Sequence, residues 1–251
     1  MNSYLARVRT NSKTWERCFW WIFRLLMIYA FVKGFLKKPF DITDPLQVAA
    51  NLAGMFAWEI FQAMPSKSLV RHIPSYVQDL SVIGLFAASF GGKFMNFYYD
   101  IRCWDSVMHF LGGAGAMILG YEIICAMQKR DKKTAPLSIV LLGAFGYSFI
   151  LGTAWELFEF TFDQISCMGG SMGDAQHWSL ELALGTAKEL TLFDPVFDER
   201  WSIMDTMGDI VLNTLGAIIC YITLKIFPYK HRGKNNINAS IEREMQKEMQ
   251  P

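Results

Sequence analysis

The sequence predicts an all-α, polytopic membrane helix bundle of about six transmembrane helices, with both termini in the cytoplasm. Hydrophobic residues make up 52% of the 251 residues, and aromatic residues 15%. A membrane-spanning helix needs about 20 mostly apolar residues, whereas the surface helices of a soluble domain carry charges at helical period. Charged residues are scarce in five long stretches and crowd between them: 46–66, 80–99, 104–128, 134–155 and 210–224.

The predicted spans cover about 18–36, 46–64, 80–97, 105–127, 136–162 and 206–227. Together they place residues 1–228 in one membrane-embedded domain, whose polar core lies within 80–220. Residues 229–251 form a polar cytoplasmic tail. The first span follows a basic segment, as a signal sequence does, but it has no small-x-small cleavage site and Arg24 interrupts it. We therefore expect a retained helix and not a cleaved signal peptide.

The distribution of basic residues predicts the orientation. The N-terminal segment, "QKRDKK" (128–133) and "YKHRGK" (229–234) are strongly basic, whereas the loop 164–204 is mostly acidic. Basic loops remain on the cytoplasmic side of a membrane. Both termini are therefore expected inside and the acidic loop outside. In this topology the fourth and sixth spans begin at the outer face, and the fifth span ends there.

The composition argues against several classes of function. The formal net charge is +1, so nothing suggests a nucleic-acid partner. The chain has no phosphate-binding loop, no serine-nucleophile motif and no H-E-x-x-H motif, so no nucleotide cofactor is expected. Cys18, Cys125 and Cys220 lie in apolar stretches, as small core residues do. Cys103 and Cys167 fall on the predicted outer side, where a disulfide is permitted.

Polar stripes occur at the predicted outer ends of three spans. Residues three or four positions apart share one face of a helix. The stripes are Asp105 and His109 on the fourth span, Glu156, Glu159 and Asp163 on the fifth, and Asp205, Asp209 and Asn213 on the sixth. Asn96 and Tyr98 lie at the outer end of the third span. Gly112, Gly152 and Gly216 continue the stripes, and small residues let membrane helices approach closely.

Several carboxylates at one depth in a membrane require compensation. An ionisable residue at the centre of a membrane helix costs about 2.5–3.5 kcal/mol, and clustered carboxylates repel one another unless they are protonated or paired with a cation. A divalent metal ion is the simplest cation. Carboxylate with imidazole suits Zn, Mn or Fe, and carboxylate alone suits Mg or Ca. The predicted ligands are Asp105, His109, Glu156, Glu159, Asp205 and Asp209, with Asn96, Tyr98, Asp163 and Asn213 in support.

A simpler interpretation exists for each residue alone. A single carboxylate near a helix end can be wetted by lipid headgroups or paired with Arg102 or Lys93, and a single histidine can be a satisfied buried residue. That interpretation leaves the shared helix faces unexplained. His109 and Glu156 are the candidates for a general base or proton carrier.

Three segments carry a resemblance to known families: "NFYYDIRCWDSVMHFLGG" (96–113), "GTAWELFEFTFDQ" (152–164) and "MDTMGDIVLNTLGA" (204–217). In this order they resemble the YjdF-like family of uncharacterised bacterial inner-membrane proteins, over roughly residues 80–220. The resemblance implies a multi-pass protein of the bacterial cytoplasmic membrane and no established activity. The chain is also similar to VanZ-like proteins at Asp105, His109, Glu156, Asp209, Asn213 and Gly216. It departs from them at Glu159, where they carry Gln, and in the inserted loop 164–204.

Three functions follow from these patterns, and all place the protein in the lipid bilayer. The first is a membrane enzyme that acts at the outer leaflet on a lipid-linked or cell-envelope substrate, with a metal ion activating water. The second is a non-catalytic membrane partner protein whose polar cluster fixes helix packing. The third is a proton- or cation-coupled transporter. Convergence of His109, Glu156, Glu159 and Asp209 around a common point would favour a bound ion.

Overall fold

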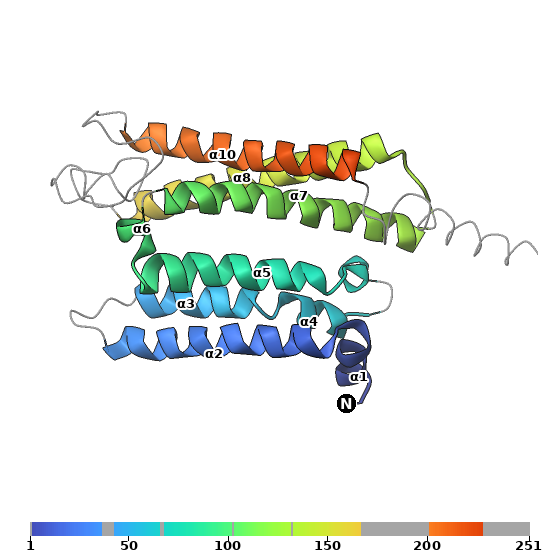
Figure 1. Cartoon of the computed structure of the whole chain (residues 1–251), viewed down its shortest axis with the longest axis horizontal. Helices are drawn as coiled ribbons and strands as arrows, with labels where there is room; N and C mark the ends of the chain where they lie inside the picture. Colours follow the sequence, from blue (N-terminus) through green and yellow to red (C-terminus); the bar gives the residue numbers. More distant parts are fainter. Residues whose placement is uncertain are drawn as a thin grey trace, which may run out of the picture.

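A computed structural model describes residues 2–36, 43–65, 68–101, 103–131, 133–166 and 201–227. The described residues form helices and no strands, so the prediction of an all-α bundle is confirmed. The helices divide into an N-terminal bundle and a C-terminal bundle that lie side by side along their length (Figure 1).

The N-terminal bundle is built around buried aromatic and methionine side chains. Its helices are α1 (Asn2–Asn11), α2 (Thr14–Leu36), α3 (Thr43–Gly54), α4 (Ala57–Ala63), the short 3₁₀-helix η1 (Leu69–His72), α5 (Tyr76–Phe86) and the π-helix η2 (Ala87–Phe94). The helices α2, α3 and α5 lie alongside one another, and α1 lies across one end (Figure 1). Trp20, Met27, Met55, Trp58 and Val82 form the centre of the core.

The C-terminal bundle consists of three long helices. After the short helix α6 (Phe97–Asp100), these are α7 (Trp104–Asp131), α8 (Leu137–Ser166) and α10 (Trp201–Ile226). Met117, Leu141 and Ala217 are buried where the three helices meet. On another face of α7, Leu119 and Ile123 pack against the N-terminal core. The helix α7 therefore joins the two bundles.

Within the described part of the chain, four helices are long and apolar enough to cross a membrane: Thr14–Leu36, Trp104–Asp131, Leu137–Glu159 and Thr206–Ile226. Their outward faces carry large apolar side chains. On α8, for example, Leu142 and Ile150 are 63% and 68% exposed. Apolar surface of this extent is typical of a lipid-facing helix and would be a liability in water.

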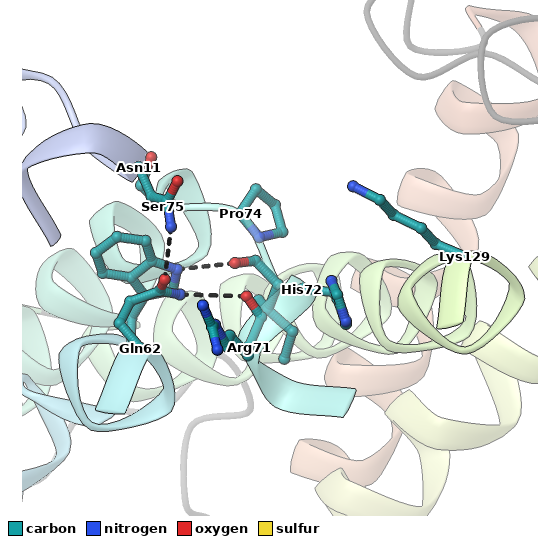
Figure 2. A pocket seen from close by; sticks show the side chains of 9 residues that line it. Asn11, Gln62, Arg71, His72, Pro74, Ser75 and Lys129 are labelled. Carbon is teal, nitrogen blue, oxygen red and sulfur yellow. Dashed lines mark hydrogen bonds between the residues drawn. The ribbon is translucent and has the colours of Figure 1, made fainter. Parts of the chain in front are cut away.

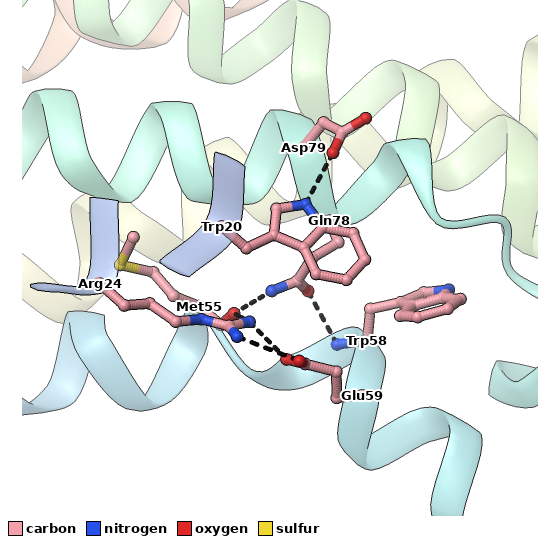
Figure 3. Close-up of polar contacts among 7 residues, drawn as sticks. All are labelled: Trp20, Arg24, Met55, Trp58, Glu59, Gln78 and Asp79. Carbon is pink, nitrogen blue, oxygen red and sulfur yellow. Dashed lines mark hydrogen bonds and ion pairs between the residues drawn. The ribbon is translucent and has the colours of Figure 1, made fainter. Parts of the chain in front are cut away.

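The second predicted span, 46–64, differs from the structure because it is broken into α3 and α4. Figure 3 shows the reason. The backbone carbonyl of Met55 accepts hydrogen bonds from the side chains of Arg24 and Gln78, and the Gln78 Oε1 accepts one from the backbone N–H of Trp58. These side chains bind the backbone groups that the break leaves free.

The third predicted span, 80–97, begins earlier, at Tyr76 of α5, and ends in the π-helix η2 at Phe94. Because α3, α4, α5 and η2 are each short, the count of six spans stays a prediction. The cytoplasmic location of both termini also stays a prediction. The division into residues 1–228 and 229–251 also stays a prediction, since residues 228–251 lie outside the described residues.

Buried polar residues also hold the N-terminal bundle together. Arg24 is fully buried, forms an ion pair with Glu59, and lies over the Phe56 ring at 3.8 Å from its centroid. The Trp20 Nε1 donates a hydrogen bond to the Asp79 Oδ1 at 2.7 Å (Figure 3). The Arg24–Glu59 ion pair links α2 to α4. Removing either partner would leave an uncompensated buried charge, so the pair is important for the packing of these two helices.

Candidate functional site

Polar side chains of the three long helices meet at one end of the C-terminal bundle. This end contains the first turns of α7 and the end of α8 (Figure 1). His109 of α7 lies at the centre. Its Nε2 is 3.5 Å from the Asp105 Oδ1 and 3.7 Å from the Asp209 Oδ2. Its Nδ1 is 3.5 Å from the Glu156 Oε1. One imidazole therefore contacts carboxylates from α7, α8 and α10.

The residues fall into two groups that share His109. One group is Asp105, His109 and Asp209, and the other is His109, Glu156 and Glu159. Within each group, one possible ligand atom from every residue lies within 4.8 Å of the others. The structure thus brings together five of the six residues that the sequence predicts as metal ligands.

Glu156 is the least compensated residue of the cluster. Its side chain is buried, with 2% of the residue exposed, and neither carboxylate oxygen has a hydrogen-bond partner among the described residues. His109 is the basic side chain beside it, with its Nδ1 3.5 Å from the Glu156 Oε1. Burying an ionised carboxylate without a partner is strongly unfavourable. The Glu156 carboxylate therefore needs a proton or a cation.

The tautomer of His109 is linked to Asn213. The Asn213 Nδ2 lies 3.2 Å from the His109 Nδ1, and in this orientation the Nδ1 of a neutral ring accepts the hydrogen bond. If the amide NH₂ faces the ring, Nδ1 accepts the hydrogen bond and the proton lies on Nε2. If the amide oxygen faces the ring, Nδ1 carries the proton and the Nε2 lone pair points toward Asp105 and Asp209. The orientation of an amide follows from its hydrogen-bond network, so the two orientations select the two tautomers.

Glycines hold the three helices close together at this site. A Cβ atom on Gly113 of α7 would overlap the backbone of Asn213, and one on Gly216 of α10 would overlap the backbone of Phe110. A Cβ atom on Gly152 of α8 would lie 3.3 Å from the Asn213 side chain. The expected close approach at small residues is therefore present, although Gly113 lies off the predicted stripe. The contact places Asp209, one turn before Asn213, beside His109.

The remaining predicted site residues are placed as follows. Asp163 and Asp205 lie on α8 and α10, one turn beyond Glu159 and one turn before Asp209, and their side chains lie outside the described part of the chain. Asn96 is exposed, has a left-handed backbone (φ 65°) and immediately precedes α6. Tyr98 packs its ring against Gly92. The supporting roles of Asn96 and Tyr98 at the cluster stay predictions.

Cys103 has a left-handed backbone (φ 66°) just before α7. Cys167 lies outside the described residues, so the possible disulfide between them stays a prediction.

The structure also reveals polar residues that the sequence analysis missed. The Thr153 hydroxyl is buried without a hydrogen-bond partner among the described residues, one turn before Glu156 on α8. The Ser148 hydroxyl donates to the Gly113 carbonyl at 2.8 Å and so joins α8 to α7. Glu122 of α7 is 1% exposed and accepts a hydrogen bond from the Tyr76 hydroxyl at 2.5 Å. The signal for Glu122 was present in the sequence, since it is a carboxylate within an apolar stretch.

The fold and this cluster define a class: an α-helical membrane protein with a buried Asp/His/Glu cluster near one end of its long helices. Residues 18–229 match the model of the family described as "Predicted membrane protein (DUF2238)", and the chain belongs to this family. It is also similar to an uncharacterised protein of Thermotoga maritima, with 26% identity over 166 residues that cover 65% of this chain and 68% of that protein. No solved structure matches the chain.

The family match begins within the first turns of α2, so it includes the N-terminal bundle without α1, as well as residues 80–220. The more specific resemblances to YjdF-like and VanZ-like proteins stay predictions. So does the bacterial cytoplasmic membrane as the location, although a membrane location follows from the family and the helices.

Proposed function

We propose that this membrane protein binds a divalent metal ion around His109 and acts as an enzyme on a lipid-linked or cell-envelope substrate at the extracytoplasmic face. The observation that carries the proposal is the Glu156 carboxylate. It is buried without a hydrogen-bond partner among the described residues, beside an imidazole that also contacts Asp105 and Asp209. A single imidazolium cannot neutralise all of these carboxylates, and a divalent cation contributes more charge.

The donor set fits such an ion. Imidazole with carboxylates suits Zn, Mn or Fe, and three protein ligands leave a position open for water or substrate. Asp105, the His109 Nε2 and Asp209 would hold the ion, because both carboxylates lie on the Nε2 side of the ring. The ion would supply Lewis acidity and a bound water that ionises near neutral pH.

The residues on the Nδ1 side of the His109 ring would orient it. A metal-bound histidine usually donates its other N–H to a carboxylate or carbonyl, which fixes its tautomer. Here the Glu156 Oε1 and the Asn213 Nδ2 both lie against the His109 Nδ1. Glu156 could accept from an Nδ1–H, and Asn213 could do so with its amide turned so that the oxygen faces the ring. They would orient the ring, and Glu156, which also has Glu159 in its group, would accept or return a proton.

The distribution of charge supports an extracytoplasmic position. The opposite end of the bundles carries the basic residues Arg7, Arg9, Lys13, Arg71, Lys129 and Arg130. Because basic segments stay in the cytoplasm, the cluster end would face outward. A substrate held in the outer leaflet would then reach the ends of α7, α8 and α10 without crossing the membrane.

Metal content of the purified protein tests the proposal. We expect protein prepared without chelators to carry close to one equivalent of Zn, Mn or Fe, and Glu156→Gln and Asp209→Asn to carry much less. Asp100→Asn is the matched control, because it makes the same kind of change to a carboxylate that is exposed on α6, outside the cluster. Wild-type protein that neither contains nor binds any of these metals would exclude the metal site.

Two alternatives remain from the sequence analysis, and each has a supporting observation. The glycine contacts around Asn213 place the cluster in the α7–α8–α10 interface, as in a partner protein whose polar residues fix helix packing. In that case Glu156→Gln would lower folding yield and leave no metal-dependent change.

The Glu122–Tyr76 hydrogen bond supplies a second protonatable group along α7, as a proton-coupled transporter needs. Proton flux in proteoliposomes that is lost in Glu122→Gln would support that function.

A further inference from the structure

A polar cavity lies at the other end of the molecule, far along α7 from His109. Its volume is about 460 Å³, within the range of roughly 300–1,000 Å³ that small-molecule sites occupy. Figure 2 shows it between α1, the end of α4, the segment around η1 and the last turns of α7. The polar residues that line it are Asn11, Gln62, Arg71, His72, Ser75 and Lys129.

Hydrogen bonds hold the wall of the cavity in place. The Gln62 side chain accepts a bond from the Asn11 amide at 2.8 Å and donates one to the Arg71 carbonyl at 3.3 Å. The Trp58 Nε1 donates to the Ile73 carbonyl at 2.8 Å. Gln62 and Trp58 are both buried. The backbone that carries Arg71 and His72 is therefore fixed to α4 before any ligand binds, which reduces the entropy cost of binding.

The charge of the cavity is positive. Arg71, His72 and Lys129 line it, and no carboxylate does so among the described residues. Neither Arg71 nor Lys129 forms an ion pair with a described carboxylate. Arg24 and Arg130 differ in this respect, since they pair with Glu59 and Asp131. The nearby Glu16 carboxylate is used outside the lining, where it accepts from the Ser75 hydroxyl at 3.1 Å.

We propose that this cavity binds a phosphate group, supplied by the headgroup of an anionic phospholipid. Arg and Lys at the ends of membrane helices form basic sites that recognise such headgroups, and the Arg guanidinium matches phosphate geometry. Met64 and Met127 follow Gln62 and precede Lys129 by two residues in the chain, and they are 40% and 41% exposed, so this end of the molecule also offers apolar surface for acyl chains. Soluble phosphate shares the same chemistry and is the other source to be distinguished. The proposal does not depend on a metal at His109.

The test adds each probe in increasing amounts to delipidated protein in detergent and measures the unfolding temperature at each concentration. The probes are phosphatidylglycerol, phosphatidylcholine, inorganic phosphate and glycerol 3-phosphate. We expect phosphatidylglycerol to stabilise the wild type more than phosphatidylcholine, whose choline cation the basic residues disfavour. Each basic contact near a membrane surface is worth about fivefold in affinity. Arg71→Gln with Lys129→Gln should therefore weaken phosphatidylglycerol binding by roughly 25-fold.

The matched control is Arg130→Gln with Lys133→Gln. It removes the same number of positive charges, from the last turn of α7 and the segment after it, and neither residue lines the cavity. We expect this control to bind as the wild type does. If the Arg71 and Lys129 double variant does not fold, Lys129→Gln alone replaces it, since Lys129 is exposed, and a fivefold loss is expected.

The outcomes separate the two sources. Stabilisation by phosphatidylglycerol but not by the soluble phosphates supports the lipid headgroup. Equal stabilisation by glycerol 3-phosphate or inorganic phosphate, lost in the same variant, supports a phosphate site and overturns the lipid. The proposal fails entirely if no phosphate compound stabilises the wild type, or if the cavity variant and the control respond alike.

Discussion

The His109 Nδ1 of α7 and the Glu156 Oε1 of α8 lie 3.5 Å apart inside the C-terminal bundle. The other nitrogen of the same ring faces Asp105 and Asp209, so one side chain connects the carboxylates of three helices. A neutral imidazole donates from one nitrogen and accepts at the other, so it can lie between ionised carboxylates on both sides only as an imidazolium or with a metal ion bound at one nitrogen.

The two groups of candidate ligands should differ in their importance for metal binding. Asp105 and Asp209 lie on the Nε2 side of His109, and Glu156 lies on the Nδ1 side. If the ion binds at Nε2, Asp209→Asn removes a ligand, whereas Glu159→Gln changes only a surrounding residue. We expect a much larger loss of affinity in Asp209→Asn than the roughly 10–100-fold loss typical of outer-shell changes. Isothermal titration of both variants measures this, and the reverse order would place the ion at Nδ1.

Metal should stabilise the folded protein through binding linkage. At a free metal concentration 100 times the dissociation constant, the gain is about 2.7 kcal/mol. Thermal unfolding in detergent, with chelator or with added Zn, Mn or Fe, measures it. Glu156→Gln changes a group beside the proposed ligands, where a roughly 10–100-fold loss of affinity is typical, so it should lose about half or more of this gain. Its chelated form should unfold no more easily than the chelated wild type, because a buried unpaired carboxylate is removed. Equal metal-dependent shifts in both proteins would argue against the cluster.

The contact between α7 and α10 should be sensitive to a single methyl group. In Gly113→Ala the new Cβ would overlap the backbone of Asn213, whereas in Gly115→Ala it would meet nothing within 4 Å. We expect Gly113→Ala to destabilise the protein by about 1–3 kcal/mol, as overpacking does. Gly115→Ala should be neutral or stabilising, because Ala favours the helix. Unfolding in detergent compares the two, and similar stabilities would show that the helices can separate without cost.

Breaking the buried ion pair should destabilise the N-terminal bundle. Glu59→Gln leaves the fully buried Arg24 without its carboxylate, and we expect a loss of about 3–5 kcal/mol. Asp131→Asn breaks the exposed pair with Arg130 and is the control, for which no measurable change is expected. A small effect of Glu59→Gln would mean that the Phe56 ring and the Met55 carbonyl suffice to stabilise the Arg24 cation.

The orientation can be tested with single cysteines in a protein whose native cysteines are replaced by serine. Asp100 is exposed at the end of α6, and Arg130 is exposed near the end of α7. We expect Asp100→Cys to react with a membrane-impermeant maleimide in intact cells, and Arg130→Cys to react only after permeabilisation, because basic segments stay inside. The opposite pattern would place the His109 cluster in the cytoplasm and exclude an outer-leaflet substrate.

The sequence by itself determined the membrane class, the long helices and the candidate cluster. Apolar stretches long enough to cross a bilayer predict membrane-spanning helices. Spacings of three and four put Asp105 with His109 and Glu156 with Glu159 on common faces, since helical geometry is local. The four long, apolar helices confirm this local reasoning, and the family match agrees with it.

Only the tertiary structure decided which residues meet across helices. The break after Met55 depends on Arg24 and Gln78, which come from other helices, so no local pattern predicts it. The two sides of His109 depend on how closely Gly113 lets α10 approach, and the basic cavity needs α1, α4 and α7 to end at the same place. Such contacts join residues far apart in the chain, and packing, not periodicity, selects them.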